Sequence, residues 1–421
     1  MAFDFGFLSL DVQVKDDKLS GKANGLLGEA LQPLVDGFCN TINSLKVIYR
    51  HEDGSIRQNL YNPPQPTKAG MRALARRILR ETFNFIYPAT GTLAVTYRCQ
   101  ARCIHCSAQR FIDPGRTELS TDEVKSVIDQ MINLWANIVV FTGGDPLVRK
   151  DLPELINHVG RDRANTLMFT NGLGLTDKKV KELAEAGLNS MYISFDHVDP
   201  KLHNEWRGVP TLYERALEGA ARAREAGILT GISTYATDET LKNGSLEQLL
   251  VTAQEQGFHE VTVFDCIPSG NFLKETERIL TPQSRRELVK LCNKFNNMDH
   301  PMGIICQSII NSPDGVGCFG FLSQFYMTAY GDIAPCDFNP VSFGNVRENT
   351  LDQIWMKARS HHHFARRHLT CRMQTPSYRK KYIDILPDDC KLPVPIETIH
   401  ALWEEKGLTK ELEKLASGSL V

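Results

Sequence analysis

Between residues 92 and 266 the sequence alternates between short apolar segments and longer amphipathic ones. The apolar segments have the length and composition of buried strands, and the segments between them have helical periodicity. The predicted strands are 93–97, 138–142, 166–170, 191–195, 228–235 and 260–266. The predicted helices are 120–134, 152–159, 177–186, 212–226 and 246–256. Strands that alternate with helices form parallel sheets, so this region predicts an α/β fold.

Three cysteines follow the first predicted strand directly, at Cys99, Cys103 and Cys106. Cysteine thiolate is the usual ligand of iron–sulfur clusters, so this C-x3-C-x2-C loop could hold three corners of a four-iron cluster. A fourth cysteine at ferredoxin spacing is missing, which leaves one iron open to a small-molecule ligand. The alternative is a zinc site with His105 as the fourth ligand.

The cysteine loop resembles that of the radical S-adenosylmethionine (SAM) enzymes, and the resemblance extends over about residues 92–270. It implies a partial (β/α)6 TIM-like barrel with its active site at the carboxyl ends of the strands. It also implies a 4Fe–4S cluster that cleaves SAM reductively to methionine and a 5′-deoxyadenosyl radical, which takes a hydrogen atom from the substrate. A reductant such as flavodoxin or ferredoxin is the implied electron donor.

The same resemblance assigns SAM contacts to the strand ends. Segment 143–146 (Gly-Gly-Asp-Pro) resembles the family's G-G-E-P, with Asp in place of Glu, and segment 194–196 resembles its S-x-D. Segment 268–270 resembles the loop near the adenine. The SAM-binding residues that the resemblance implies are Gly143, Gly144, Asp145, Ser194, Asp196, Arg207 and Ser233.

A second cysteine pattern, C-x12-G-x4-C, places Cys318 and Cys336 around Gly331. It resembles the first half of the auxiliary-cluster module of the SPASM and twitch subgroup, where a hairpin turn brings the two cysteines together. The remaining SPASM cysteine run is absent, and only Cys371 and Cys390 follow. The resemblance therefore implies one auxiliary 4Fe–4S cluster, closed if both of these cysteines ligate and open at one iron if only one does. A structural zinc ion on the four cysteines is the alternative.

Three regions are predicted: an N-terminal α+β extension (1–90), the radical SAM core barrel (91–300) and an auxiliary iron–sulfur domain (301–421). The extension contains a predicted strand (5–14), a helix (26–38), a hairpin (45–60) and a basic helix (71–80). The basic side chains of that last helix are Arg72, Arg76, Arg77 and Arg80. They are expected to form a solvated face of a helix docked on the core. The alternative is contact with an anionic substrate or a peripheral membrane surface.

Composition narrows the class of protein further. The chain has 421 residues and a formal net charge of −2, so it lacks a general basic field for nucleic acid. It has no apolar run long enough to predict a transmembrane helix and no signal-peptide pattern. It has eleven cysteines, and those that are clustered in such a chain indicate metal ligands in a cytoplasmic protein. Cys39, Cys266, Cys292 and Cys306 stand alone and are expected to be buried. His361 to His363 are expected to be solvated or to face an anion.

The resulting interpretation is a radical SAM oxidoreductase with an auxiliary cluster that modifies a peptide or protein. A small-molecule or lipid-like substrate is the first alternative. A non-catalytic iron–sulfur electron-transfer protein or a zinc-stabilised binding protein is an alternative of another class. The sequence identifies no catalytic proton or hydrogen donor. Cys266, at the end of the sixth predicted strand, is the best-placed thiol for that role, but we expect it to be buried and dispensable.

Overall fold

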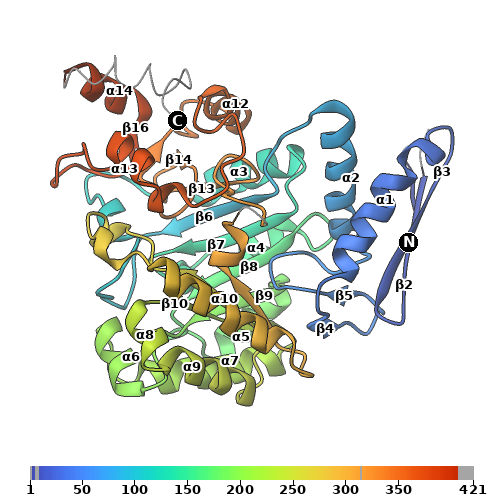
Figure 1. Ribbon diagram of the computed structural model, residues 1–421, viewed down its shortest axis with the longest axis horizontal. Helices are drawn as coiled ribbons and strands as arrows, with labels where there is room; N and C mark the ends of the chain where they lie inside the picture. Colours follow the sequence, from blue (N-terminus) through green and yellow to red (C-terminus); the bar gives the residue numbers. More distant parts are fainter. Residues whose placement is uncertain (1, 5–8, 313–314, 406–421) are drawn as a thin grey trace.

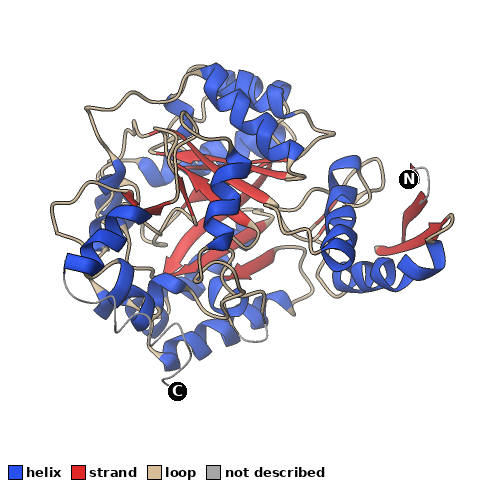
Figure 2. Ribbon diagram, turned by 90° about the horizontal axis from the view of Figure 1, so that it is seen from above, coloured by secondary structure: helices blue, strands red, loops and turns tan. Residues whose placement is uncertain are grey.

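The computed structural model describes residues 2–4, 9–312 and 315–405, and a nine-stranded sheet forms its centre (Figures 1 and 2). Seven neighbouring strands run in the order β12-β11-β10-β9-β8-β7-β6, and all their pairings are parallel. Six of them are the strands predicted from the sequence. Their bounds are β6 Thr90–Thr96, β7 Ile138–Gly143, β8 Asn165–Thr170, β9 Ser190–Ser194, β10 Leu229–Ala236 and β11 Glu260–Asp265. The α/β partial barrel is thereby confirmed.

The predicted helices connect these strands and surround the sheet (Figure 2). They are α3 Thr121–Asn133, α4 Leu152–Val159, α5 Asp177–Ala186, α7 Leu212–Glu225 and α9 Ser245–Glu255. Helix α3 begins and helix α5 ends at the capping residues expected from the sequence. Ser120 and Glu123 form a reciprocal capping box at the start of α3, and Gly187 ends α5 with φ 99°.

Several elements of the barrel were not predicted. Helix α6 (Pro200–Arg207) and the short helix α8 (Asp238–Lys242) lie in the connections after β9 and β10. Helix α10 (Pro282–Asn296) leads to strand β12 (Gly303–Cys306), which extends the parallel sheet beyond β11. A short helix, α11 (Gln307–Ile310), follows. The proposed domain limit at residue 300 falls directly before β12, and it stays a prediction.

The C-terminal region joins the barrel sheet at its other side. The predicted hairpin is formed by β13 (Gln324–Met327) and β14 (Ile333–Ala334), with Gly331 at φ 94° in the turn. Strand β13 also pairs in parallel with β6, and the hydroxyls of Tyr97 and Tyr326 lie 3.0 Å apart across this junction. The remaining elements are β15 Val341–Ser342, α12 Leu351–Ser360, α13 Pro376–Tyr382, β16 Val394–Pro395 and α14 Ile396–Glu405.

The N-terminal extension lies to one side of the barrel (Figure 1). Strands β1 (Ala2–Asp4), β2 (Ser9–Lys15) and β3 (Lys18–Asn24) form an antiparallel sheet that packs on α1 (Gly28–Asn43). Strand β3 was not predicted, and residues 5–8 of the predicted strand 5–14 lie outside the described residues. In α2 (Lys68–Phe83), Arg72 and Arg76 donate to the backbone oxygens of Ile132 and Tyr87. Two of the four basic side chains therefore dock the helix on the core.

The predicted hairpin, formed by β4 (Tyr49–Arg50) and β5 (Ile56–Arg57), lies near the amino ends of the barrel strands. Arg57 is buried and donates to Asn165 at the start of β8, and the Leu60 N–H donates to Glu260 at the start of β11. Burial raises the pKa of Glu260 to about 8. The hairpin segment thus contacts the end of the barrel opposite the cysteine loop.

Candidate active site

The cysteine loop begins where β6 ends, so its three thiols lie at the carboxyl end of the barrel. Cys99 is exposed, and Cys103 and Cys106 are half-buried. Burial, the Asp196 carboxylate and the neighbouring thiols together raise the pKa of the Cys103 thiol to about 11, although the Arg207 guanidinium opposes them. The side chains are close enough to interact electrostatically and are free of disulfides. Their role as ligands of the SAM-binding cluster stays a prediction.

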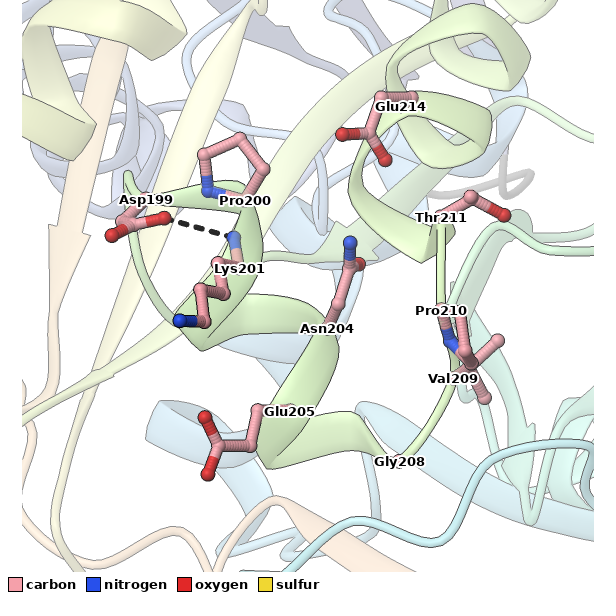
Figure 3. A pocket seen from close by; sticks show the side chains of 10 residues that line it. All are labelled: Asp199, Pro200, Lys201, Asn204, Glu205, Gly208, Val209, Pro210, Thr211 and Glu214. Carbon is pink, nitrogen blue, oxygen red and sulfur yellow. Dashed lines mark hydrogen bonds between the residues drawn. The ribbon is translucent and has the colours of Figure 1, made fainter.

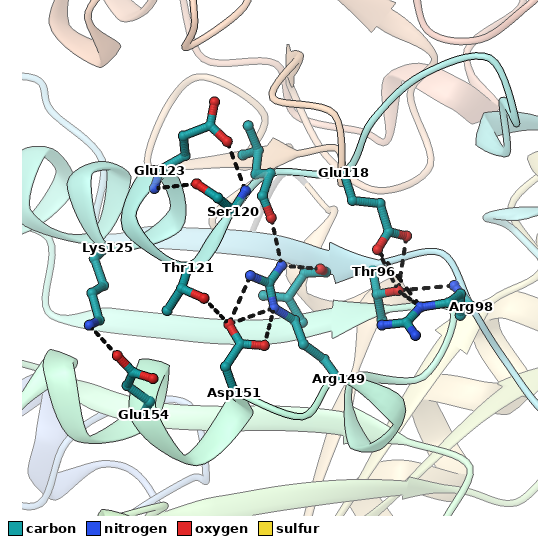
Figure 4. Close-up of polar contacts among 12 residues, drawn as sticks. Thr96, Arg98, Glu118, Ser120, Thr121, Glu123, Lys125, Arg149, Asp151 and Glu154 are labelled. Atoms are coloured by element: carbon teal, nitrogen blue, oxygen red, sulfur yellow. Dashed lines mark hydrogen bonds and ion pairs between the residues drawn. The ribbon is translucent and has the colours of Figure 1, made fainter.

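A network of polar contacts fixes the entry of the chain into this loop (Figure 4). Glu118 accepts hydrogen bonds from the Thr96 hydroxyl at 2.9 Å and from the Tyr97 N–H at 2.7 Å. Arg149 is buried, donates to the backbone oxygen of Val95 and pairs with Asp151 at 2.9 Å. Hydrogen bonds from the segments that precede α3 and α4 therefore fix the last residues of β6.

Gly143 and Gly144 let the end of β7 lie directly against the cysteine loop. A Cβ atom at Gly143, where φ is 142°, would lie 2.0 Å from the backbone oxygen of Thr96. A Cβ at Gly144 would lie 2.5 Å from that of Arg98. The Gly144 N–H also donates to Thr96 at 2.7 Å. Any side chain here would displace the loop, so these two glycines are required by backbone approach.

Asp145 links β7 to β8 below the loop. It is fully buried and accepts hydrogen bonds from the Thr170 hydroxyl, the Asn171 N–H and the Leu147 N–H. The amide of Asn171 in turn lies 3.7 Å from the sulfur of Cys99. Asp145, which stands where the family usually has Glu, therefore binds the backbone N–H groups of Leu147 and Asn171. This fixes the position of Asn171, whose amide lies beside the Cys99 thiol.

Asp196 and Arg207 form a buried ion pair on the other side of the loop. The guanidinium donates to both carboxylate oxygens, at 2.6 and 2.7 Å, and the ring of His105 lies 3.4 Å from the same carboxylate. Burial alone would raise the pKa of Asp196, but the charges of Arg207 and His105 hold it well below its usual range. Both oxygens are thus occupied, and Asp196 orients Arg207 and His105.

Two further segments hold the backbone of the cysteine loop. The N–H groups of Arg102 and Ile104 donate to the backbone oxygens of Arg207 and Trp206 at the end of α6. In the segment after β11, Gly270 has φ 51° and a Cβ there would lie 2.1 Å from the backbone oxygen of Cys106. The loop predicted to lie near the adenine therefore contacts the cysteine loop itself.

Ser194 and Ser233 are direct neighbours on β9 and β10 and are both half-buried. Side chains two apart in a strand share a face, so Ser233 and Tyr235 point the same way. The Tyr235 ring packs on His105 with 4.8 Å between ring centroids. These hydroxyls therefore lie beside the cysteine loop, on the barrel face that the resemblance assigns to SAM.

At the predicted auxiliary site, three of the four cysteines come together. Burial and the neighbouring Cys318 thiol together raise the pKa of the Cys371 thiol to about 12. Cys336 is affected by both of these thiols. Cys390 lies elsewhere, 3.9 Å from the Arg110 guanidinium near the barrel mouth. Its inclusion among the metal ligands stays a prediction, which this placement does not support.

Two kinds of metal centre could use these thiols, a single zinc ion and an iron–sulfur cluster. A zinc ion holds its ligands about 2.0–2.3 Å from itself, so they must lie close together. Within residues 2–4, 9–312 and 315–405, no three His, Cys, Asp or Glu side chains are near enough to hold one ion. The donors at each site are cysteine thiols, and thiolates are the usual ligands of iron–sulfur clusters, so the residue types fit that cofactor.

Other side chains lie differently from what was expected, or away from the cysteines. His361 and His363 pack on the ring of Tyr382, and burial lowers their pKa values to about 3 and about 2. The expectation that they are solvated or face an anion is wrong for these two. Cys39, Cys266, Cys292 and Cys306 are buried as expected.

A shallow surface hollow lies between α6 and the start of α7, lined by Asn204, Glu205 and Glu214 among others (Figure 3). It lies outside the cysteine loop.

Sequence reasoning missed five polar side chains around the loop: His105 as a loop contact, Glu118, Arg149, Asn171 and Tyr235. Asn171 and Tyr235 could have been found, because both lie at the carboxyl ends of predicted strands. Glu118 and Arg149 lie in connections and carry no pattern of their own.

In the described residues, no helix is long and apolar enough to cross a membrane.

Comparison with known proteins gives matches over both cysteine regions. Residues 93–250 match the family described as the radical SAM superfamily, and residues 318–378 match SPASM, described as an iron–sulfur cluster-binding domain. An "AdoMet-dependent heme synthase" of Oleidesulfovibrio alaskensis is 28% identical over 295 residues, which cover 64% of this chain and 76% of the relative. An "Fe-coproporphyrin III synthase" of Methanosarcina barkeri is 25% identical over 289 residues, or 62% of this chain and 72% of the relative. The crystal structure of Streptococcus suis SuiB bound to its precursor peptide SuiA has a TM-score of 0.52 at 16% identity and covers 78% of this chain and 77% of that chain. This last likeness shows the fold alone.

Proposed function

This chain belongs to the radical SAM superfamily with an SPASM-type iron–sulfur domain, and from that premise we propose that Cys99, Cys103 and Cys106 hold the SAM-binding cluster. The protein is an enzyme whose family uses SAM and 4Fe–4S clusters, so the non-catalytic alternative is set aside. The bound cluster and SAM supply a strong one-electron reductant and a radical that removes a hydrogen atom from the substrate.

One observation carries this proposal: four separate segments contact the backbone or a thiol of a single cysteine loop. They are the ends of β7 and β8, the end of α6 and the segment after β11. The glycines at 143, 144 and 270 fit these positions because a Cβ atom would clash with the loop. Such convergence fixes three thiols in one orientation and leaves the adjacent Ser194, Ser233 and Tyr235 free to bind a ligand.

The chain's own residues would then act by binding and orienting. Arg207 is charged at every physiological pH and lies beside the loop, so it would attract the carboxylate of SAM while Asp196 fixes its direction. Ser194 and Ser233 would donate to or accept from ligand hydroxyls. An unselective radical requires a site without water, and Cys99 is exposed, so bound SAM and substrate would have to cover this part of the loop.

For the substrate we propose a small molecule of the heme-forming tetrapyrrole class. The support is the similarity in sequence to proteins named as heme and Fe-coproporphyrin III synthases. The side chains Phe169, Tyr235 and Phe264 lie at the carboxyl ends of their strands and are half-buried, which suits a flat conjugated ring. This choice replaces the peptide as the leading candidate.

A peptide or protein substrate, the first expectation from the sequence, stays a prediction. In the described residues, β3 pairs with only one strand, β2, but α1 covers its other edge. Asn43 bonds both backbone groups of Leu19, and Gln32 bonds the Gly21 oxygen and the Ala23 N–H, so this edge does not offer itself to an extended peptide. In either case we propose a cytoplasmic enzyme, because thiolate ligands need a reducing compartment, and an electron donor such as flavodoxin or ferredoxin.

The test uses the protein reconstituted anaerobically with iron and sulfide and reduced with dithionite. We expect about eight irons per chain, from two four-iron clusters, and 5′-deoxyadenosine from SAM. Addition of Fe-coproporphyrin III as the probe should accelerate 5′-deoxyadenosine formation and change the porphyrin's mass. Cleavage of SAM without any response to the porphyrin would contradict the substrate class and redirect the search to peptides. A protein without SAM cleavage would contradict the reaction itself.

A further inference from the structure

Arg372 is the residue that follows Cys371, and it carries a buried charge without a partner of opposite charge. Its side chain is 2% exposed. One terminal nitrogen, Nη2, donates to the backbone oxygens of His363 and Arg366. The other two nitrogens, Nε and Nη1, are buried and have no hydrogen-bond partner. Across the described part of the chain, no carboxylate lies within ion-pair distance of this guanidinium.

The surroundings of Arg372 offer it no compensation. The guanidinium lies 4.7 Å above the ring of Phe364, and its charge acts on the neighbouring His361 and His363. Both histidines are neutral, because burial, their first-listed cause, lowers their pKa values. Arg359 adds a second cation nearby, since burial and then Arg372 lower its pKa. The environment is therefore aromatic or cationic.

Arg379, seven residues later in α13, provides the comparison. It is also 2% exposed, but it forms an ion pair with Asp384 at 3.2 Å. A buried guanidinium that keeps a carboxylate partner is ordinary, whereas an unpaired one is strongly unfavourable. Arg372 thus requires an anion that the amino-acid side chains do not provide.

The auxiliary thiols are a candidate source of such an anion, because Arg372 directly follows Cys371 and both residues are buried. Burial raises the pKa of Tyr378, and its hydroxyl accepts a hydrogen bond from Asn339 at 2.8 Å. The ring of Tyr378 packs on Phe364, the same ring that the Arg372 guanidinium covers, with 6.4 Å between ring centroids. Asn339 in turn donates its N–H to the backbone oxygen of Cys336 at 3.2 Å. Phe364, Tyr378 and Asn339 therefore connect the guanidinium to the segment of Cys336. Three thiolates bound to a four-iron cluster carry net negative charge in both redox states of the cluster, and more in the reduced one.

We propose that Arg372 is the buried counter-ion of the auxiliary cluster and that its charge favours the cluster's reduced state. This inference rests on the proposed ligation of that cluster by Cys318, Cys336 and Cys371. Net charge near an iron–sulfur cluster is one of the factors that set its reduction potential. Arg372 is a positioning and tuning residue and does not touch the substrate.

The experiment is a potentiometric titration of the reconstituted protein followed by electron paramagnetic resonance. A variant with Cys99, Cys103 and Cys106 changed to Ala identifies which signal belongs to the auxiliary cluster. Arg372→Gln should lower the reduction equilibrium constant of that cluster at least tenfold, a shift of 59 mV for a one-electron couple. Arg372→Lys, which keeps the charge, should stay within threefold of the unmodified protein. Arg366→Gln, which removes a neighbouring exposed charge, should also stay within threefold.

Three outcomes overturn the inference. The first is an Arg372→Gln protein with about eight irons, the content of two four-iron clusters, and a potential equal to that of Arg366→Gln. The second is the loss of the auxiliary cluster from both Arg372→Gln and Arg372→Lys. If only Arg372→Gln loses the cluster, and Arg372→Lys binds it with a nearly unchanged potential, the inference is supported. The third is an unmodified protein that binds zinc in place of a second cluster, which contradicts the proposed auxiliary site as well. Unchanged potentials with two clusters present would contradict the role of Arg372 alone.

Discussion

The two cysteine sites are assembled in different ways. The three cysteines of the barrel site lie on one loop, and distant segments only orient that loop through backbone contacts. The three cysteines of the auxiliary site come from separate segments, before β13, after β14 and after α12, and only the tertiary fold brings them together. A local motif therefore identifies its own ligands, whereas a dispersed site can be completed only from the structure.

The largest expected effect is the loss of the loop site. Changing Cys99, Cys103 and Cys106 to Ala should abolish SAM cleavage and lower the iron content from about eight to about four per chain, because each four-iron cluster needs its thiolates. The measurement is 5′-deoxyadenosine by chromatography together with iron analysis. Continued formation of 5′-deoxyadenosine would show that this loop is not the catalytic site.

The next prediction separates the two C-terminal cysteines. Cys371→Ala should lower the iron content to about four, because it removes one of three converging ligands. Cys390→Ala should leave about eight irons and an unchanged spectrum, because this thiol lies beside Arg110, away from the trio. The matched pair is measured after the same reconstitution. Equal iron loss in both variants would mean that Cys390 moves to the cluster when iron binds.

The third prediction concerns the ion pair that supports the loop site. Asp196→Asn leaves the buried Arg207 charge without a partner, so it should lower the free energy of unfolding by about 3 kcal/mol and weaken SAM binding. Both clusters should still form. Asp196→Asn combined with Arg207→Met should recover part of the stability but none of the SAM affinity. Chemical denaturation and SAM titration provide the measurements, and unchanged SAM affinity in Asp196→Asn would restrict this residue to a structural role.

A smaller effect is expected at Asn171, whose amide lies 3.7 Å from the Cys99 sulfur. Hydrogen bonds to cluster sulfurs help to set the potential. Asn171→Ala should therefore shift the reduction equilibrium of the SAM-binding cluster toward the oxidised state by about fivefold, which corresponds to about 1 kcal/mol. The auxiliary cluster provides the internal control, and a shift of both clusters together would point to a general change of structure.

The smallest effect is expected at Cys266. This thiol is buried, and burial raises its pKa to about 11, so it is neutral at physiological pH. Cys266→Ala should leave SAM cleavage and product formation unchanged, consistent with net oxidation of the substrate. Normal SAM cleavage without product would instead assign Cys266 the return of a hydrogen atom.

The sequence predicted the barrel well because each strand and helix there is a local pattern. Caps such as Ser120 and stops such as Gly187 are visible without knowledge of the fold. It did not reveal that β13 pairs with β6, because sheet pairing between distant segments depends on shape and on which strand edge remains open. The same reason explains the site: the cysteine loop was predicted, but the contacts of Asp196 with Arg207 and of Glu118 with Thr96 join residues whose proximity no spacing rule gives.

The pairing of β13 with β6 has a consequence for protein engineering. A chain cut before Gln324 would leave the backbone N–H and C=O groups of β6 unpaired along one side. Such an exposed edge strand is a template for aggregation. The auxiliary region is therefore not a cassette that can be removed or exchanged at its first cysteine. A chimera with a related enzyme would need to transfer β13 and β14 together with the strand they cover.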